Sequence, residues 1–546
     1  MLFTLHRYIF RELLRVFLLA AVALALILSL GSILQPIQEY GIGPRQVLHM
    51  MGYFLPITLT FVLPMAALFA GSLVYGRFAG DNEFDACRAT GISVWTLVYP
   101  GLALAIIVAT ANLFLSFYVM PVFVHRAEES LKADAKQILF RNIQRRRYYE
   151  LPPDRRYVIY ADQANLQNDM LSGVILMAME NNEITDITTA EAAKISFNPQ
   201  DSFNEVHITA YNTGQMGAEG QGGAGSLSVS KEFGSLLGDD IKFKKIDEMK
   251  RIKADPIRFY PIEKLARDSY AQLTIELLAQ HIRNRTGGTA KRSEMPSSAG
   301  GDVASFYELI GEPNSVRFAA GQYNLQGDRV DLSGEIEVVE YHTEGKLPSR
   351  NFTCAGASLH IEGDPLAPTL TMDLRSLQEQ GSAELNMRYV ISGLTMPQVV
   401  EVKANKFRTE HGSPRVDELA WQLQELSGLE PSPKLQGLQN RLRRQMRKTS
   451  VEIKAEIHSR LVFGTGCVPM ILIGIGLGII KRGGHLLSAF GASCVPAAVL
   501  IVCIMSGKQI TENLTADTFS GVAMMWTGLG FLSLVTVVIY GWLLRN

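Results

Sequence analysis

Six long apolar stretches, three near each end of the chain, constrain its fold more than any other feature of the sequence. They lie at about residues 16–34, 53–75, 94–120, 461–480, 486–505 and 522–544. Each is close to the roughly 20 residues that a helix needs to cross the hydrocarbon core of a bilayer. Residues 121–454 contain no such stretch. We therefore expect six transmembrane helices interrupted by one large insertion.

Basic residues fix the expected orientation of these helices. Arg7, Arg11 and Arg15 precede the first stretch, and Lys481 and Arg482 lie in the turn between the fourth and the fifth. Short cytoplasmic segments are enriched in lysine and arginine, so both termini are predicted to be cytoplasmic and the insertion extracytoplasmic. No small-residue cleavage pattern follows the first stretch, which should therefore stay in the membrane.

Strand signals are frequent in the insertion. Segments that alternate apolar and polar residues with the period of half-buried strands are residues 156–161, 173–179, 184–187, 206–210, 315–323, 329–341 and 355–361. Turn signals stand at Gly327-Asp328, at Ser333-Gly334 and at Gly345. Many short strands with little helix between them predict a sandwich, a jelly roll or an open barrel.

Other parts of the insertion have different signals. Two stretches rich in glycine and serine, residues 214–228 and 287–301, are predicted to be mobile loops. Helical periodicity is found in residues 261–284 between them, and again in residues 415–426 and 435–460 before the fourth apolar stretch.

The predicted fold class is a membrane α-helical protein with six transmembrane helices and an inserted extracytoplasmic all-β, jelly-roll-like domain. Its parts are a membrane half at residues 1–120, an insertion at 121–454 and a second membrane half at 455–546. The insertion forms either one domain or two parts divided near residues 214–301. A multi-pass membrane protein with its large insertion outside the cytoplasm is therefore expected.

A polar break at residues 71–101 interrupts the apolar first part of the chain. We expect a short helix at about residues 81–91, between the second and third spans. Asp81 or Asn82 can cap its N-terminus and Gly91 can end it. Such an elbow is either a solvated turn between two spans or a helix that docks in a groove of a soluble partner.

Side chains of this elbow favour the docking interpretation in one respect. Glu83 and Asp85 fall in the first helical turn, where the helix dipole favours negative charge, and Arg88 follows one turn later. Phe84 supplies an apolar side chain among them. We expect an inserted apolar side chain and a carboxylate that fixes the orientation of the partner.

Prolines and glycines inside the spans indicate close helix packing. Prolines at positions 56, 64 and 100 are tolerated in membrane helices because neighbouring helices can satisfy the freed carbonyls. Gly474, Gly476 and Gly478 repeat in the fourth span and permit close approach of another helix, or a sliding interface that opens.

Five basic residues precede the fourth span: Arg441, Arg443, Arg444, Arg447 and Lys448. A positive charge there does not contradict the topology, because long external domains translocate largely regardless of charge. These side chains could extend to lipid phosphates or could contact an anionic lipid substrate, and the sequence leaves both interpretations open.

Several functions are excluded by missing patterns. The chain has no Gly-x-x-x-x-Gly-Lys-Ser/Thr loop, so we expect that it does not bind and hydrolyse ATP itself. Glu456 and His458 are two residues apart and would point to different faces of a helix, so no metal site, cofactor or catalytic residue is expected. A net charge of −1 predicts no nucleic-acid partner.

These features together resemble the LptF/LptG family of permeases, the paired membrane subunits of the ABC transporter that extracts lipopolysaccharide from the bacterial inner membrane. The residues that carry the resemblance are RYI at 7–9, FVLPMA at 61–66, GR at 76–77, NEF at 82–84, ATGIS at 89–93, Pro121, EIHSR at 456–460 and GIGLGII at 474–480. They follow in order through both membrane parts, and the strand-rich insertion lies where the family has a periplasmic β-jelly roll.

The resemblance implies a function and a set of partners. The chain would be a non-catalytic transport subunit whose elbow is the coupling helix, with Glu83 at the family's acidic docking position for a cytoplasmic ATPase dimer. A second permease of the family would complete the cavity, and spans one and five would form the lateral gate for lipopolysaccharide or a related glycolipid. Periplasmic jelly-roll bridge proteins would receive the lipid, and no cofactor is implied.

The sequence departs from the family in two places. Residues 34–38 lack the lysine or arginine that some members carry near the outer end of the first span, so Arg45, Arg126, Arg460 and Lys508 are the expected contacts to the lipid head group. The insertion is also longer than the family's usual one. Its residues 319–338 resemble the repeats of the soluble bridge proteins, which indicates an added or enlarged jelly roll.

Two other functions are compatible with the sequence. A membrane-anchored mechanotransmission or scaffold protein would be driven by an ATPase without passing lipid, and its outer domain would have no apolar cleft. A membrane-bound enzyme would require a cluster of titratable groups in one pocket, for which the sequence offers no candidate.

Overall fold

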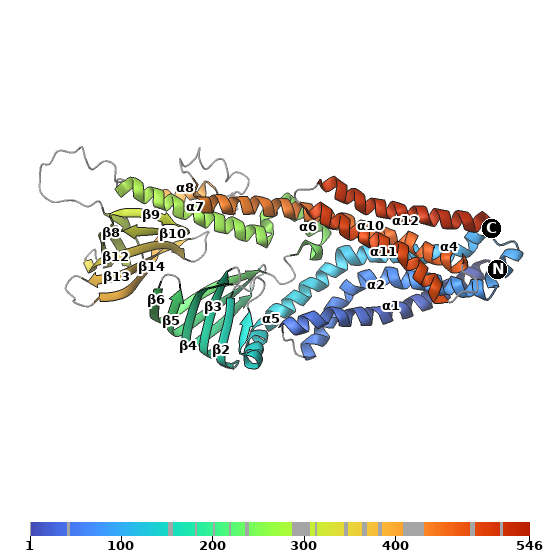
Figure 1. Ribbon diagram of the computed structural model, residues 1–546, viewed down its shortest axis with the longest axis horizontal. Coiled ribbons are helices and arrows are strands. Elements are labelled where there is room, and N and C mark those ends of the chain that lie inside the picture. The colour runs from blue at the N-terminus through green and yellow to red at the C-terminus, as the bar shows by residue number, and fades with distance from the viewer. Residues whose placement is uncertain are drawn as a thin grey trace. The chain divides into compact units, whose positions relative to one another are not determined.

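A computed structural model of the chain describes most of its residues (Figure 1). The described residues are 2–40, 44–150, 157–180, 183–199, 203–217, 220–234, 240–286, 306–311, 314–342, 348–362, 368–379, 385–407, 431–480, 486–513 and 517–545. They form two compact units, of which the first comprises Met1–Asp255 with Arg447–Asn546 and the second Pro256–Met446.

The first unit contains the membrane helices. They are α1 (Leu2–Tyr40), α2 (Pro44–Gly80), α4 (Val94–Phe114), α10 (Pro433–Ile480), α11 (Leu486–Glu512) and α12 (Thr518–Arg545), and a short helix α3 (Glu83–Ala89) joins α2 to α4. Within the described residues, six helices are long and apolar enough to cross a membrane. The predicted number of spans is therefore confirmed, although α10 extends far beyond its apolar part because its first half is the basic, helix-forming segment.

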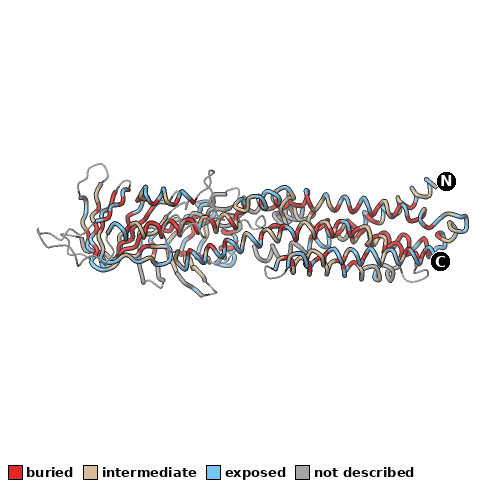
Figure 2. Tube along the Cα trace, turned by 90° about the horizontal axis from the view of Figure 1, so that it is seen from above, coloured by how far each residue is buried: buried red, intermediate tan, exposed pale blue. Residues whose placement is uncertain are grey.

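The helices at the two termini, α1 and α12, are largely exposed with one buried side, whereas α2 and α10 are mostly buried (Figure 2). On α1 the buried residues Ile9, Leu13 and Phe17 recur every four positions, whereas Leu18 and Val22 are more than half exposed. This spacing keeps one face against α2 and α4 and leaves the other apolar face for lipid.

Prolines in these helices are compensated as expected. Pro100 of α4 has no N–H to donate to the carbonyl of Thr96, four residues before it. The Nε2 of His6 on α1 donates to that carbonyl instead, at 3.0 Å. The prediction that neighbouring helices satisfy freed carbonyls is thus confirmed at this position.

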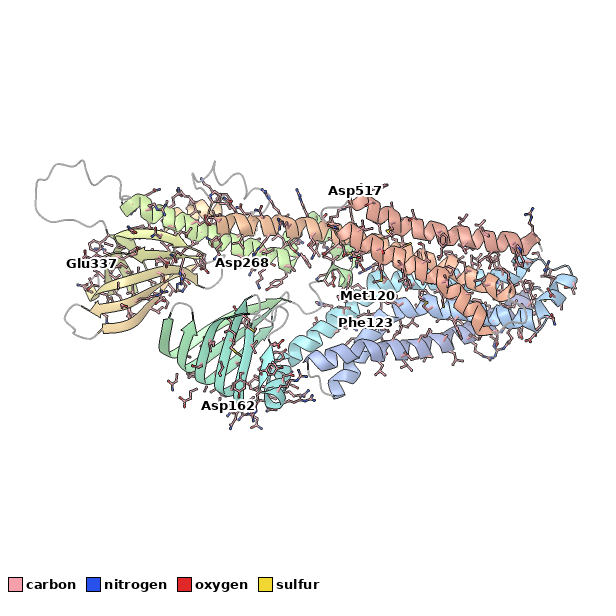
Figure 3. The ribbon with its side chains drawn as sticks, viewed as in Figure 1. Met120, Phe123, Asp162, Asp268, Glu337 and Asp517 are labelled. Atoms are coloured by element: carbon pink, nitrogen blue, oxygen red, sulfur yellow. The ribbon has the colours of Figure 1, made fainter. Side chains whose placement is uncertain are left out.

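A π-helical turn, η1 (Leu115–Val119), continues α4 directly into α5 (Met120–Arg146). The last turns of α5 reach the first β-sheet, where Leu139, Phe140 and Ile143 are at most 1% exposed and share a core with Ile159. One continuous helical rod therefore leads from the membrane into the sheet, and Met120 and Phe123 lie on it (Figure 3).

The first sheet, sheet A, is an antiparallel meander in which each strand pairs with the next. Its strands are β1 (Tyr148–Glu150), β2 (Tyr157–Asn165), β3 (Met170–Glu180), β4 (Glu183–Pro199), β5 (Phe203–Gly217) and β6 (Gly220–Gly234). The expected β-rich insertion between the membrane halves is confirmed, with up-and-down connectivity. A 3₁₀ turn η2 (Ile241–Phe243) and helix α6 (Ile246–Ala254) follow it.

Alanines stand among larger aliphatic side chains on the buried face of sheet A. Ala190 pairs with Val174, and Ala193 lies between Leu171 and Ala210. These residues are at most 8% exposed. The pairing of β5 and β6 also corrects one expectation, because residues 214–217 and 220–228 lie in these paired strands instead of a loop: Gly214 pairs with Gly223. Glycine has no side chain to prevent such backbone pairing, although it weakens a strand.

The second unit contains helix α7 (Tyr260–Thr286), as predicted for residues 261–284, and a second sheet, sheet B. A 3₁₀ turn η3 (Pro256–Arg258) precedes α7, and helix α8 (Gln398–Asn405) follows the last strand of sheet B. The strands of sheet B are β7 (Tyr307–Leu309), β8 (Asn314–Ala319), β9 (Gln322–Gln326), β10 (Arg329–Ser333), β11 (Ile336–His342), β12 (Pro348–Glu362), β13 (Thr369–Glu379) and β14 (Leu385–Thr395). The predicted turns at Gly327 and Gly334 are confirmed, and both glycines have positive φ, 62° and 92°.

Sheet B encloses a filled core. Its large residues Phe318, Val338, Leu359 and Met372 are fully buried and share one apolar cluster with Leu277 of α7. A bridge between Gly311 and Leu394 joins the two ends of the sheet. Sheet B is thus a self-contained domain whose interior is occupied by its own side chains. Two predictions, the loop at 287–301 and the helix at 415–426, lie outside the described residues, as does the turn at Gly345.

Candidate functional site

The elbow between the second and third spans is helix α3. Asn82 stands at its N-cap with φ 59°, in the left-handed region, and its side chain makes no capping hydrogen bond. Gly91, with φ 86°, follows the last turn, and its N–H donates to the carbonyl of Arg88 at 2.9 Å. Ser93 then caps α4 by accepting from the amide of Thr96 at 3.3 Å. The chain therefore reverses sharply on both sides of α3.

Phe84 holds this helix against the bundle. Its side chain is 2% exposed and belongs to the same core cluster as Val74, Phe78 and Leu97. This position corrects the expectation that Phe84 is the apolar side chain offered to a partner, because it is already buried in its own chain. An aromatic anchor at the second position fixes which face of so short a helix is turned outward.

The outward face of α3 is acidic and small. Asp81, Asn82 and Glu83 are exposed, and Asp85 and Arg88 are half-buried. Ala86 and Ala89 add exposed surface with little bulk. The structure thus brings the predicted residues together on one elbow and presents the carboxylate of Glu83 outward.

The four basic residues expected to contact a lipid head group do not form one site. The side chain of Arg45, in the first turn of α2, lies outside the described residues. Arg126 is exposed on α5, with its guanidinium 5.8 Å from the centre of the Phe123 ring. Arg460 and Lys508 converge on one carboxylate, that of Glu456.

Glu456 is buried and bound on both oxygens. Its Oε1 accepts from the Nε of Arg460 at 2.8 Å, and its Oε2 accepts from the Nζ of Lys508 at 2.6 Å. Lys508 also lies 3.8 Å from Glu512. Because two carboxylates neutralise two cations, the cluster has no excess positive charge with which to attract a phosphate.

Arg460 is saturated by these partners. Besides Glu456, its Nη1 donates to the carbonyls of Ser116 at 2.9 Å and Lys244 at 3.3 Å, and its Nη2 donates to the carbonyl of Lys242 at 2.7 Å. The side chain is only 4% exposed. Its assignment as a head-group contact is therefore corrected: the guanidinium is used within the chain. Lys508, 31% exposed, keeps some access to solvent.

Sequence reasoning missed Glu456 as the centre of this cluster, although it did place Glu456 and His458 on different faces. The structure agrees with that placement, since the Nδ1 of His458 accepts from the indole of Trp526 at 3.3 Å. The spacing of Glu456 and Arg460, four residues apart on a helix, was the available signal. The carbonyls that complete the site come from residues 116 and 242–244, which no local pattern joins to Arg460.

The predicted packing glycines lie at helix contacts. A Cβ placed on Gly474 would be 3.0 Å from the carbonyl oxygen of Leu68, and one on Gly478 would be 2.7 Å from that of Ser72. A Cβ on Gly476 would be 2.4 Å from Cγ2 of Ile539. Two of the three glycines thus set α10 against the backbone of α2, and the third sets it against α12.

Comparison with known proteins gives one family. Residues 7–236 match the model of the family described as lipopolysaccharide export system permease LptF/LptG. The match includes α1 to α5 and sheet A, and sheet B lies beyond it. No curated protein sequence matches the chain. Over residues 7–236 the chain is therefore similar to the LptF/LptG family of permeases, and its six membrane helices, its elbow and its inserted β-sheet accompany this match.

Proposed function

We propose that the chain is the non-catalytic permease subunit of an ATP-driven exporter in the bacterial inner membrane. It extracts lipopolysaccharide or a related glycolipid and passes it to a jelly-roll bridge protein in the periplasm. The observation that carries this proposal is the outward carboxylate of Glu83 on α3, a helix anchored between two membrane spans by Phe84.

The elbow is the docking helix for a cytoplasmic ATPase dimer. Movement imposed on α3 passes directly to α2 and α4, because Phe84 shares their core. Tyr75 of α2 adds a second connection, since its hydroxyl donates to the carbonyl of Leu97 on α4 at 2.9 Å. ATP-driven closure would therefore move two spans together and narrow a cavity formed with a second permease of the family. Lipid would enter that cavity laterally, between α1 of one permease and α11 of the other.

Sheet A is the first receiver of the lipid outside the membrane. Its buried face carries alanines such as Ala193 and Ala210 among larger aliphatic residues, and the end of α5 shares that core. Its last strand, β6, is paired with β5 alone among the described strands, so its other edge can add a strand of a bridge protein. This is the path we assign to acyl chains between the membrane and the next jelly roll.

The charge of Glu83 provides the test. The tagged chain and its Glu83→Lys variant are purified in mild detergent from a host that supplies the ATPase, and co-purification is compared. We expect the reversal to cost about 2–5 kcal/mol of binding if the carboxylate meets a buried cation, which would abolish co-purification. Glu129→Lys, the same change on the exposed face of α5, is the matched control and should retain the ATPase. The proposal would be contradicted if the ATPase co-purified with both variants, or if it did not co-purify with the unaltered chain.

A mechanotransmission protein without lipid transport is the second candidate. The filled core of sheet B favours it, because the described buried side chains of that domain pack against one another in one apolar cluster. The two functions differ in bound lipid: a permease should retain glycolipid when purified in mild detergent, and release it when ATP is added. A purified complex that hydrolyses ATP without ever holding glycolipid would favour mechanotransmission.

A further inference from the structure

Three segments that are distant in sequence meet at the guanidinium of Arg460. Arg460 itself lies on α10 and holds Glu456 one turn before it. Ser116 belongs to η1, at the start of the chain that enters sheet A, and Lys242 and Lys244 belong to the chain that leaves sheet A. Glu456 extends the cluster to α11 through Lys508. One side chain therefore binds both connections of sheet A to the membrane helices.

The carbonyl of Ser116 is free for this contact because of Pro121. In the π-helical turn the amide of Met120 donates to the carbonyl of Leu115, five residues before it. The next amide in that pattern would serve Ser116, but Pro121 has no N–H. A freed carbonyl near the membrane needs another donor, and Arg460 supplies it. The ring of Phe117, 5.5 Å from the guanidinium, closes the site on one side.

The two bound segments differ in stiffness. On the entering side, η1 leads into the 27 residues of α5, whose end is embedded in the core of sheet A. On the leaving side, the turn η2 is short and is held by hydrogen bonds from Phe243 to Asp240 and from Lys244 to Ile241, both 3.1 Å. A displacement of α10 would be transmitted to sheet A through the rod of α5, provided that η1 stays attached to α10.

We propose that Arg460 is a positioning residue for transport, which clamps sheet A to α10 so that movement of the membrane helices displaces the sheet. The role of this movement in lipid transport rests on the proposed function, whereas the existence of the clamp does not. Glu456 fixes the orientation of the guanidinium. Glu456 and Glu512 together balance the positive charges of Arg460 and Lys508. The cluster is thus a mechanical connection and not a site for the lipid phosphate.

A lysine at position 460 separates these roles. Lysine would keep the positive charge and a contact with Glu456, but a single ammonium cannot reach the carbonyls of residues 116, 242 and 244 in the directions that the planar guanidinium serves. The matched control is Arg447→Lys on the same helix, where the arginine is exposed. Both changes are conservative in charge and helix propensity, so both variants should fold.

Amide hydrogen exchange measures the clamp directly in the purified chain. In Arg460→Lys we expect the amides of Phe243 and Lys244 to exchange about tenfold faster or more, because the turn loses charged hydrogen bonds that hold it. Amides in α1 and in the β2–β3 ladder should be unchanged, and Arg447→Lys should match the native chain everywhere. Unchanged exchange of Phe243 and Lys244 in Arg460→Lys would overturn the inference. So would an equal increase throughout the membrane helices, because Arg460 would then be a general stability residue.

A reconstituted exporter measures the consequence. With the ATPase and the second permease present, Arg460→Lys should bind the ATPase and hydrolyse ATP at the native rate, while the amount of lipid released per ATP falls by about tenfold. Native release per ATP in Arg460→Lys would overturn the inference. If the native chain itself binds no ATPase, the proposed function fails, and the exchange experiment still decides whether the clamp exists.

Discussion

Sheets A and B are both antiparallel and both lie in the insertion, but they are built for different purposes. In sheet A the buried positions carry alanines among Ile, Leu and Val, the strands follow one another in a meander, and the helix that shares the core is the continuation of a membrane span. In sheet B the buried positions carry large residues, α7 belongs to the same core, and a bridge joins the ends of the sheet. The difference teaches that two sheets of like strand content can be tied to different parts of the chain. The end of a helix that continues a membrane span shares the core of sheet A, whereas α7 of the second unit shares the core of sheet B.

The largest expected effect comes from removing a side chain from the core of sheet B. Phe318 is fully buried and its ring lies 5.6 Å from that of Tyr307. Phe318→Ala should lower the free energy of unfolding of the second unit by about 3–5 kcal/mol, because it removes apolar contacts and leaves a cavity. Amide exchange of β8 and β12 measures the loss. Phe306→Ala, at a position 46% exposed, is the control and should change little.

The opposite change tests sheet A. Ala193 is fully buried between Leu171 and Ala210, so Ala193→Leu should cost about 1–3 kcal/mol by overpacking. The expected loss appears as faster exchange in the β3–β5 ladder. Lys194→Leu, one residue later and exposed, places the same side chain on the other face and should be nearly neutral. If Ala193→Leu were as harmless as its neighbour, the core of sheet A would be looser than described.

High pH should weaken sheet B. Burial raises the pKa of the Cys354 thiol to about 11 and that of the Tyr307 hydroxyl to about 12. Their ordinary values are 9.0 and 10.0, so the unfolded chain loses these protons first as the pH rises. The stability of the second unit should therefore be complete below pH 9 and should fall between that value and pH 11 to 12. In Cys354→Ala the free energy of unfolding, measured against pH, should fall less steeply in the lower part of this range. An unchanged slope would contradict the raised pKa of Cys354.

The smallest expected effect concerns Asp268 on α7 (Figure 3). Partial desolvation raises the pKa of this carboxyl although the residue is exposed, and the nearby cations Lys264 and Lys434 only partly oppose the shift. Its charged form is therefore less stable in the folded unit than in the unfolded chain. Because solvent screens an exposed charge, Asp268→Asn should raise the free energy of unfolding at pH 7 only slightly. The gain should vanish at acidic pH, where the aspartate is protonated in both states. A variant less stable than the native chain at pH 7 would show that the ion pairs outweigh the burial.

Much of the fold could be predicted, because it depends on local patterns. Long apolar stretches fixed the number of spans, and the turns at Gly327 and Gly334 follow from residues that tolerate positive φ. The paired strands at residues 214–217 and 220–228 were missed, since glycine-rich segments more often form loops than strands.

The candidate site was predictable only in part, for a related reason. The residues of the elbow are contiguous, so their shared place on α3 could be inferred. The cluster at Glu456 could not, because the Ser116 carbonyl is 344 positions from Arg460 in sequence. Four basic residues near the outer surface looked equivalent in sequence, and only the packing shows that Arg460 is already occupied.

The most direct test of the account asks which sheet meets the lipid. A photo-reactive amino acid is introduced at position 176, on the buried face of sheet A, or at position 325, beside the core of sheet B. The variants are illuminated in bacteria that make lipopolysaccharide. We predict a glycolipid adduct at position 176 that disappears when the Glu83→Lys change is added, and none at position 325. Adducts at position 325 alone, or adducts at 176 that persist with Glu83→Lys, would contradict the claim that α3 drives lipid onto sheet A.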